Sequence, residues 1–358
     1  ASTPSGLTYL ESTWTNNDAY DGELVSINSD NTILASVHDG QVVLFNTSNY
    51  DKIASFSIPR VSAIEFSPDG TLLAVNKDKS AANQDTIKII DIPSLTLLDE
   101  GGITDIDAED IAWSQDGEVL AIKNDGKEVN LYRKSDLSVK NTLDGIHNTD
   151  IICIDYSSNN SILTGDVSGR YAYWNETGMS QGAYREYGAS LLDCMFSPDG
   201  NEIILLDVYG NLKSSTIEGV QKNTMNVSGA MKVLLSKSGN KIYVAVQSEE
   251  FRGLITYDYD TFAEEKRTSF FHNINDIEIV ENEYSQLSAL YVAGGAGQVA
   301  VYLKNSFPEG YGEQGADLDG DKVPDIIDDD DDGDGIIDNW DDGIGCDAPE
   351  GIPCSKYP

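Results

Sequence analysis

Aspartates recur at a fixed spacing near the end of the chain, and this spacing suggests that they bind a cation. Two stretches follow the pattern D-x-D-x-D-x-x-x-D-x-x-D, one starting at residue 317 and the next at residue 330. Ca²⁺ takes about six to eight oxygen ligands, supplied by loop positions 1, 3, 5, 7, 9 and 12, with a backbone carbonyl at position 7. No soft ligand is interleaved, which argues against zinc or copper. The expected ligands are Asp317, Asp319, Asp321, Val323, Asp325 and Asp328 for the first calcium site, and Asp330, Asp332, Asp334, Ile336, Asp338 and Asp341 for the second.

A disordered, solvated acidic run is the alternative interpretation of this segment. The regular spacing of the carboxylates and the glycines inside the loops favour the calcium sites. The segment closely resembles thrombospondin type 3 repeats, a resemblance that implies bound calcium in place of a hydrophobic core. Lys322 departs from the family at position 6, where glycine is favoured, whereas Gly335 fits the second site.

The four cysteines fall into two predicted groups. Cys346 and Cys354 lie close together in the Gly- and Pro-rich tail, so we predict a local disulfide formed in an oxidising compartment. Cys153 and Cys194 are expected to be buried and unpaired. Cys153 lies three residues before Tyr156, but Cys194 lies two before Phe196, which places the two side chains on opposite faces of their strands.

Familiar catalytic motifs are absent from the sequence. There is no phosphate-binding glycine loop, no G-x-S-x-G and no H-E-x-x-H, and the three histidines His38, His147 and His272 fall in predicted turns or loops. We therefore predict no catalytic residue, although carboxylate pairs for glycoside hydrolysis stay open because the geometry between repeats is invisible in the sequence. Four N-glycosylation acceptors occur by pattern, at Asn46, Asn159, Asn175 and Asn226.

Residues 24–293 contain a repeated unit of two strands joined by a turn, which must position the side chains in this part of the chain. Examples are VSAIEFSPDGTLLAV from residue 61 and LLDCMFSPDGNEIIL from residue 191. A large residue before each turn marks the register, and it recurs at steps of 39, 47, 43, 40, 39 and 44 residues. The marker residues are Ile27, Phe66, Trp113, Tyr156, Phe196, Leu235 and Ile279. Such a period suits four short antiparallel strands per unit.

The expected fold is all-β, a seven-bladed β-propeller of four-stranded antiparallel blades. The last blade has three strands of its own, so its outer strand is expected from Gly6–Thr13, which closes the ring. Over roughly residues 6–305 the units resemble the WD-repeat family, because F-S-P-D-G occurs at 66–70 and 196–200 and Trp174-Asn175 replaces Trp-Asp. The family's Gly-His pair and structural Asp are mostly missing. We expect the propeller over 1–306, a linker over 307–316 and the irregular calcium-binding tail over 317–358.

Charge and hydropathy limit the classes of partner. The 61 acidic and 23 basic residues give a net charge of −38, which excludes the basic footprint of a nucleic-acid-binding protein. No apolar run is long enough to span a membrane. The start at Ala1 reads like a mature N-terminus whose export signal has been removed, so we expect a secreted or cell-surface location.

The expected function is binding. Its partner is a protein or a surface glycan, or a second copy in a surface layer or filament. The alternative is an extracellular hydrolase or lyase that works in the central channel, and a channel lined by polar residues would favour it. Fold alone does not decide between them, since propellers host both.

Overall fold

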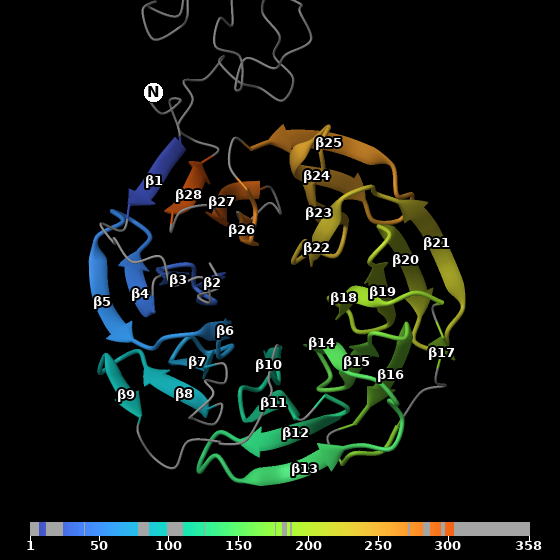
Figure 1. Ribbon diagram of the computed structural model, residues 1–358, viewed down its shortest axis with the longest axis horizontal. Coiled ribbons are helices and arrows are strands. Elements are labelled where there is room, and N and C mark those ends of the chain that lie inside the picture. Colours follow the sequence, from blue (N-terminus) through green and yellow to red (C-terminus); the bar gives the residue numbers. More distant parts are fainter. Residues whose placement is uncertain are drawn as a thin grey trace, which may run out of the picture.

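The computed structural model consists of β-strands and their connections, with no helix in the part of the chain that it describes (Figure 1). It describes residues 7–11, 24–38, 40–77, 86–98, 110–124, 126–175, 177–180, 185–186, 188–270, 273–281, 287–294 and 298–303. The strands form seven four-stranded antiparallel sheets arranged around a common centre. The predicted all-β propeller is therefore confirmed.

Each sheet is one blade, and its first strand lies nearest the centre of the ring (Figure 1). Blade 1 contains β2 (Leu24–Ile27), β3 (Ile33–His38), β4 (Gln41–Asn46) and β5 (Lys52–Ser57). Blade 2 contains β6 (Val61–Phe66), β7 (Leu72–Lys77), β8 (Thr86–Asp91) and β9 (Thr96–Leu98). Blade 3 contains β10 (Ile111–Trp113), β11 (Val119–Asn124), β12 (Glu128–Arg133) and β13 (Val139–Leu143). Blade 4 contains β14 (Ile151–Tyr156), β15 (Ile162–Asp166), β16 (Arg170–Trp174) and β17 (Arg185–Glu186).

The remaining three blades follow the same order from the centre outward. Blade 5 contains β18 (Leu191–Phe196), β19 (Glu202–Asp207), β20 (Asn211–Thr216) and β21 (Gln221–Asn226). Blade 6 contains β22 (Ala230–Leu235), β23 (Lys241–Gln247), β24 (Arg252–Asp258) and β25 (Glu264–Ser269). Blade 7 contains β26 (Asp276–Glu281), β27 (Leu287–Gly294), β28 (Gln298–Leu303) and β1 (Leu7–Glu11).

The two ends of the described chain close the ring. The strand β1 pairs antiparallel with β28, from Leu7 opposite Tyr302 to Glu11 opposite Gln298. The expected outer strand of the last blade is therefore present. Pairing at this position gives β28 a partner and removes an open edge, which a propeller would otherwise leave exposed.

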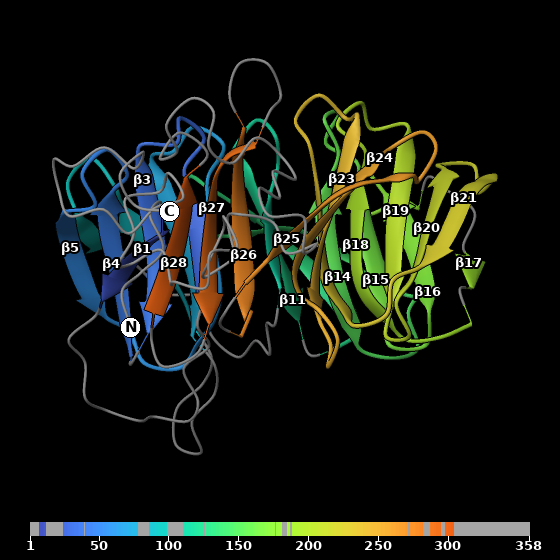
Figure 2. The same ribbon diagram turned by 90° about the horizontal axis from the view of Figure 1, so that it is seen from above.

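Seven apolar clusters form the core, one between each pair of neighbouring blades. The cluster between blades 7 and 1, for example, combines Val25 and Leu34 with Tyr291 and Val299. Middle strands such as β4 and β23 are buried along nearly their whole length because they are covered on both faces, whereas the outermost strands β5 and β21 alternate between exposed and partly buried residues. Figure 2 shows the blades standing side by side in a disc whose thickness is one strand length.

The turn between the first two strands of a blade is held by its own side chains. In blade 2 the Ser67 hydroxyl donates to Asp69 Oδ1 at 2.6 Å, and the N–H of Thr71 donates to the same oxygen at 3.0 Å. Gly70 follows with a φ of 69°, a conformation that a side chain disfavours. In blades 2, 3 and 5 a Ser–x–Asp–Gly turn therefore fixes where the first strand ends and the second strand starts.

No helix long and apolar enough to cross a membrane occurs among the residues that the structure describes.

Candidate functional site

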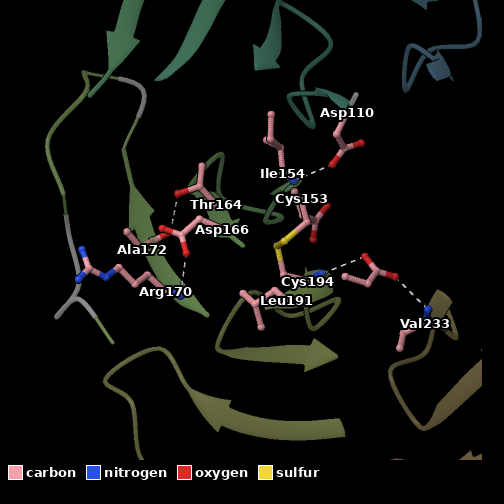
Figure 3. The surroundings of a disulfide bond; sticks show 12 residues. Asp110, Cys153, Ile154, Thr164, Asp166, Arg170, Ala172, Leu191, Cys194 and Val233 are labelled. Carbon is pink, nitrogen blue, oxygen red and sulfur yellow. Dashed lines mark hydrogen bonds between the residues drawn. A yellow bond between two sulfur atoms is a disulfide. The ribbon is translucent and has the colours of Figure 1, made fainter. Parts of the chain in front are cut away.

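Aspartates at one repeat position connect the central strands of neighbouring blades. Asp110, Asp193 and Asp276 each lie three residues before the marker residue of their blade. Asp110 Oδ2 accepts the N–H of Ile154 in blade 4 at 2.7 Å (Figure 3). Asp193 Oδ2 accepts the N–H of Val233 in blade 6 at 2.9 Å.

Blade 7 makes the same connection to blade 1. Asp276 Oδ2 accepts the N–H of Val25 at 3.1 Å, across the closure of the ring. In all three cases the other carboxylate oxygen accepts the N–H of the residue that follows the aspartate, at 2.9 to 3.0 Å. Each aspartate therefore satisfies a backbone donor in its own blade and one in the next.

Blade 6 has a lysine at this repeat position. Lys232 Nζ lies 2.6 Å from Asp276 Oδ1, an ion pair between blades 6 and 7 in which the lysine side chain keeps 35% of its area exposed and the aspartate 12%. Burial lowers the pKa of Lys232, but the charges of Asp276, Glu278 and Asp193 outweigh it and raise the pKa above its ordinary value. The ammonium group is thus charged and surrounded by carboxylates.

A second tier of acids lies one residue before the marker. It contains Glu65, Asp155 and Glu278 in blades 2, 4 and 7. Glu65 interacts electrostatically with both Asp155 and Glu278, although the three belong to blades that are not neighbours. These carboxyl groups therefore face one common space, the central channel, where six acids meet the single ammonium of Lys232 among the described residues at these two positions.

Burial of the channel carboxyl groups changes their pKa values. Burial raises the pKa of Asp110 and Asp155 to about 7 and that of Asp193 to about 6, in each case against the backbone hydrogen bonds that the carboxylate accepts. Burial also raises the pKa of Glu278 to about 7 and that of Glu65 well above its usual range. Groups of this kind can take up or release a proton near neutral pH.

A hollow of about 320 Å³, called the channel mouth below, lies where the central strands of blades 3 to 6 end. Its wall is built mainly from the turns after the central strands of blades 3 to 6. Lining residues include Asp155, Tyr156, Phe196, Gln115, Ser158 and Lys237. Asp155 Oδ2 accepts the N–H of Phe196 at 2.6 Å, which holds the carboxyl group in place at this mouth. The hollow brings together an acid, a lysine, and the hydroxyl and amide groups of Ser158 and Gln115.

A disulfide joins Cys153 and Cys194, which corrects the prediction that these cysteines are unpaired (Figure 3). The side chains do lie on opposite faces of their strands. In a ring, however, one face of a blade meets the opposite face of the next blade. Cys153 therefore faces blade 5, and Cys194 faces blade 4 together with Phe196, in one apolar cluster.

The disulfide occupies the same repeat position as the channel aspartates. Cys153 lies three residues before Tyr156, where blades 3, 5 and 7 have aspartate. Gly165 makes room for the bridge, because a Cβ at this residue would lie 2.6 Å from Cys153 Sγ and 2.6 Å from Leu191 Cδ1. Blade 4 is thus tied to blade 5 covalently, whereas the aspartates tie their blades through hydrogen bonds.

His147 is part of a buried network inside blade 4. Its Nδ1 lies 2.8 Å from Asp166 Oδ2, and its Nε2 lies 2.7 Å from Thr164 Oγ1, which also accepts the indole N–H of Trp174 at 2.8 Å. Burial lowers the pKa of His147. Both ring nitrogens are engaged by structural partners, so His147 does not offer a base to a substrate. His272 and the side chain of His38 lie outside the described residues.

The predicted calcium sites and the Cys346–Cys354 disulfide lie outside the described residues, which end at Leu303. Within the described part of the chain, no three acidic, histidine or cysteine side chains are grouped closely enough to hold a metal ion. The calcium ligands and the second disulfide therefore stay predictions.

The four glycosylation acceptors differ in the hydrogen bonds that their side-chain amides make. Asn226 Nδ2 donates to the carbonyl of Tyr209 at 2.9 Å and to Asn211 Oδ1 at 3.0 Å. In Asn46, Asn159 and Asn175 the amide oxygen instead accepts the N–H of the residue two positions later, and that of Asn159 also accepts the hydroxyl of Ser157. A glycan on Asn226 would replace one of the two N–H groups that make these contacts, so the other three acceptors fit the modification better.

Sequence reasoning missed the channel acids. Their signal was available, because Asp110, Asp193 and Asp276 share one repeat position on otherwise apolar central strands. An alignment of the repeats on their marker residues would have shown these three aspartates at one position. It would not have shown that Glu65, Asp155 and Glu278 face the same channel.

Comparison with known proteins gives no assignment. No family model matches the chain, and no curated protein matches it.

Proposed function

We propose that this chain is an extracellular or cell-surface binding protein. Its WD-repeat-like propeller is the interaction platform, and its thrombospondin type 3-like tail, stiffened by calcium, is a spacer or docking element. The partner is a protein or a surface glycan. In a variant of the proposal, the tail bridges to a neighbouring propeller and the chain assembles into a surface layer or filament.

The disulfide between Cys153 and Cys194 carries the proposed location. Disulfides persist in oxidising environments such as the cell exterior and are rare where thiols are kept reduced. Both cysteines are almost fully buried, at 3% and 4% exposure, so the bond is a structural part of the blade interface. The net charge of −38 fits a protein that stays soluble in water rich in divalent cations.

The hydrogen bonds that the channel acids accept favour a binding function over a catalytic one. Asp110, Asp193 and Asp276 accept backbone N–H groups from the next blade. Such carboxylates hold the ring together, and a general acid or base must instead be within reach of substrate.

An extracellular enzyme is the second candidate, and one observation favours it. The channel is lined by polar residues, the feature expected of the enzyme alternative, and Asp155 has a pKa of about 7 beside an open hollow. A carboxyl group with that pKa can act as a general acid or base. His147 is held by its own partners inside blade 4, whereas Ser158 and Ser197 line the same hollow as Asp155.

Cell fractionation tests the location and the calcium dependence together. Intact cells of the source are treated with a protease that does not enter them, and the surface fraction is then washed with EDTA or with calcium. We expect the propeller to be digested only from outside, and EDTA to release it or its partner from the surface fraction. A protein that is protected from external protease and has reactive Cys153 and Cys194 thiols would contradict the proposal.

A further inference from the structure

The hollow at the channel mouth has charges of opposite sign at two depths. Asp155 lies on the central strand β14, next to the channel, whereas Lys237 lies in the exposed turn after β22. Gln115 and Lys237 come from blades 3 and 6, so the hollow extends across the mouth and is wider than one blade interface.

The electrostatic field of the channel acids attracts positive charge at this mouth. Glu65 and Glu278 share the repeat position of Asp155, Glu65 interacts electrostatically with both, and Lys232 is the ammonium group among the channel acids. A positive group entering this mouth is drawn inward, and a negative group is held back near Lys237. A ligand that carries both charges can satisfy both ends of the hollow at once.

The walls between the two charges are suited to a small organic molecule. Ser158 and Gln115 add hydroxyl and amide groups to the hollow, and Tyr156 and Phe196 border it from the apolar clusters between the blades. The volume of about 320 Å³ is at the lower end of the range for ligand sites, which is about 300–1,000 Å³. Asp155 has already accepted the N–H of Phe196, but a carboxylate offers about four lone-pair sites, so it can accept further donors.

We propose that this mouth binds a small zwitterion such as an amino acid, with its ammonium group on Asp155 and its carboxylate on Lys237. The inference rests on the proposed function in that it makes the channel mouth a binding site rather than a catalytic one. It deepens that function by giving the propeller a small-molecule ligand in addition to its surface partner.

Calorimetric titration of the full chain tests the site with three kinds of probe. Glycine, 4-aminobutanoate and 6-aminohexanoate carry both charges at increasing separation, hexylammonium carries only the positive charge, and hexanoate carries only the negative one. We expect one of the three zwitterions to bind saturably and both single-charge probes to bind at least about tenfold more weakly. If none of the zwitterions binds saturably, or if hexylammonium binds as tightly as they do, the proposal is wrong.

Matched variants locate the binding site. Asp155→Asn keeps an oxygen for the N–H of Phe196 and removes the charge, and Lys237→Gln removes the ammonium group. Each is expected to weaken the zwitterion by about tenfold or more. Asp258→Asn and Lys241→Gln change similar residues on the outer part of blade 6 and should leave binding unchanged. Equal loss in the control pair would place the binding elsewhere and overturn the proposal.

The readouts separate this inference from the proposed function. Thermal unfolding of each variant shows that the fold is retained, and NMR of the ligand after a long incubation shows whether it is unchanged. An unchanged ligand supports a binding site, whereas a consumed ligand would contradict the binding function and favour the enzyme. A cytosolic location would contradict the proposed function and leave the titration result standing.

Discussion

At the scale of single residues, three kinds of side chain connect neighbouring blades from one repeat position. In five of the seven blades the residue three positions before the marker connects a central strand to the next blade. Aspartate does so through a backbone N–H in blades 3, 5 and 7, Lys232 through an ion pair in blade 6, and Cys153 through a disulfide in blade 4. Each contact adds a polar or covalent link to the apolar packing between two neighbouring blades.

Removing one of these carboxylates should destabilise the ring. In Asp193→Ala the N–H groups of Val233 and Cys194 lose their acceptor, and an unsatisfied buried donor costs about 1–3 kcal/mol. Asp193→Asn keeps one acceptor oxygen and should cost less. The free energy of unfolding in urea measures both. Asp144→Ala, at an exposed carboxylate, is the control, and equal stability of Asp193→Ala and this control would contradict the assigned role.

The channel acids should make stability fall as the pH rises from about 4 to 7. An unfolded carboxyl group titrates near pH 4, whereas Asp110, Asp155 and Glu278 titrate at about 7 and Asp193 at about 6 in the folded state. The folded state therefore binds more protons in this window, and its stabilisation is lost as the pH rises through the folded pKa values.

Other groups that face these acids modify the slope without reversing it. Glu65 adds a further acid with a raised pKa, Asp276 is paired with Lys232, and buried His147 has a lowered pKa and so contributes the opposite sign. Thermal unfolding at a series of pH values measures the slope. The double variant Asp155→Asn, Glu278→Gln should flatten it, and a melting temperature that rises steadily from pH 5 to about 7 would contradict the assignment.

At the scale of elements, the interface between β14 and β18 differs from the others because it is covalent. Reducing the disulfide, or replacing both cysteines by serine, removes a constraint on a loop of 41 residues in the unfolded chain. Loops of this kind contribute about 2–4 kcal/mol. Unfolding with and without reductant should show a loss of this size.

The pairing itself can be read by mass spectrometry. Digestion without reductant should give a crosslinked peptide that contains Cys153 and Cys194. Alkylation of both thiols in the unreduced, denatured protein would show that they are unpaired.

The sequence predicted the elements well because each carries local information. The Ser–x–Asp–Gly turns and the marker residues identify the central strands, and the unpaired segment before the first blade identifies β1. The disulfide was missed because it depends on how two blades face each other, a relation between elements that one strand's alternation does not contain. The channel was missed for the same reason, since Glu65, Asp155 and Glu278 are 90 and 123 residues apart in the chain and meet only when the ring closes.

At the scale of the whole molecule, stability depends on closure by β1. Deleting residues 1–13 removes the partner of β28 and leaves blade 7 with an open edge. We expect the melting temperature to fall by several degrees, because each kcal/mol corresponds to about 2–4 °C in a domain of this size. An unchanged melting temperature in the truncated protein would show that β1 does not hold the ring.

The proposed function also needs the tail to respond to calcium. Without metal, the aspartates of residues 317–342 repel one another at close range and little apolar surface is available to offset the repulsion. We therefore expect calcium binding to be coupled to folding of the tail. EDTA should make residues 317–345 sensitive to protease while the propeller keeps its strand signal in circular dichroism.

Calorimetric titration of the full chain with calcium tests the proposed function most directly. We predict saturable binding of two ions at concentrations up to about the millimolar range, as in extracellular calcium modules. Asp334→Ala removes a charged ligand from position 5 of the second site and should weaken that site alone, whereas Asp144→Ala in the propeller should change neither. The absence of saturable binding at millimolar calcium would contradict the account and favour a solvated acidic run.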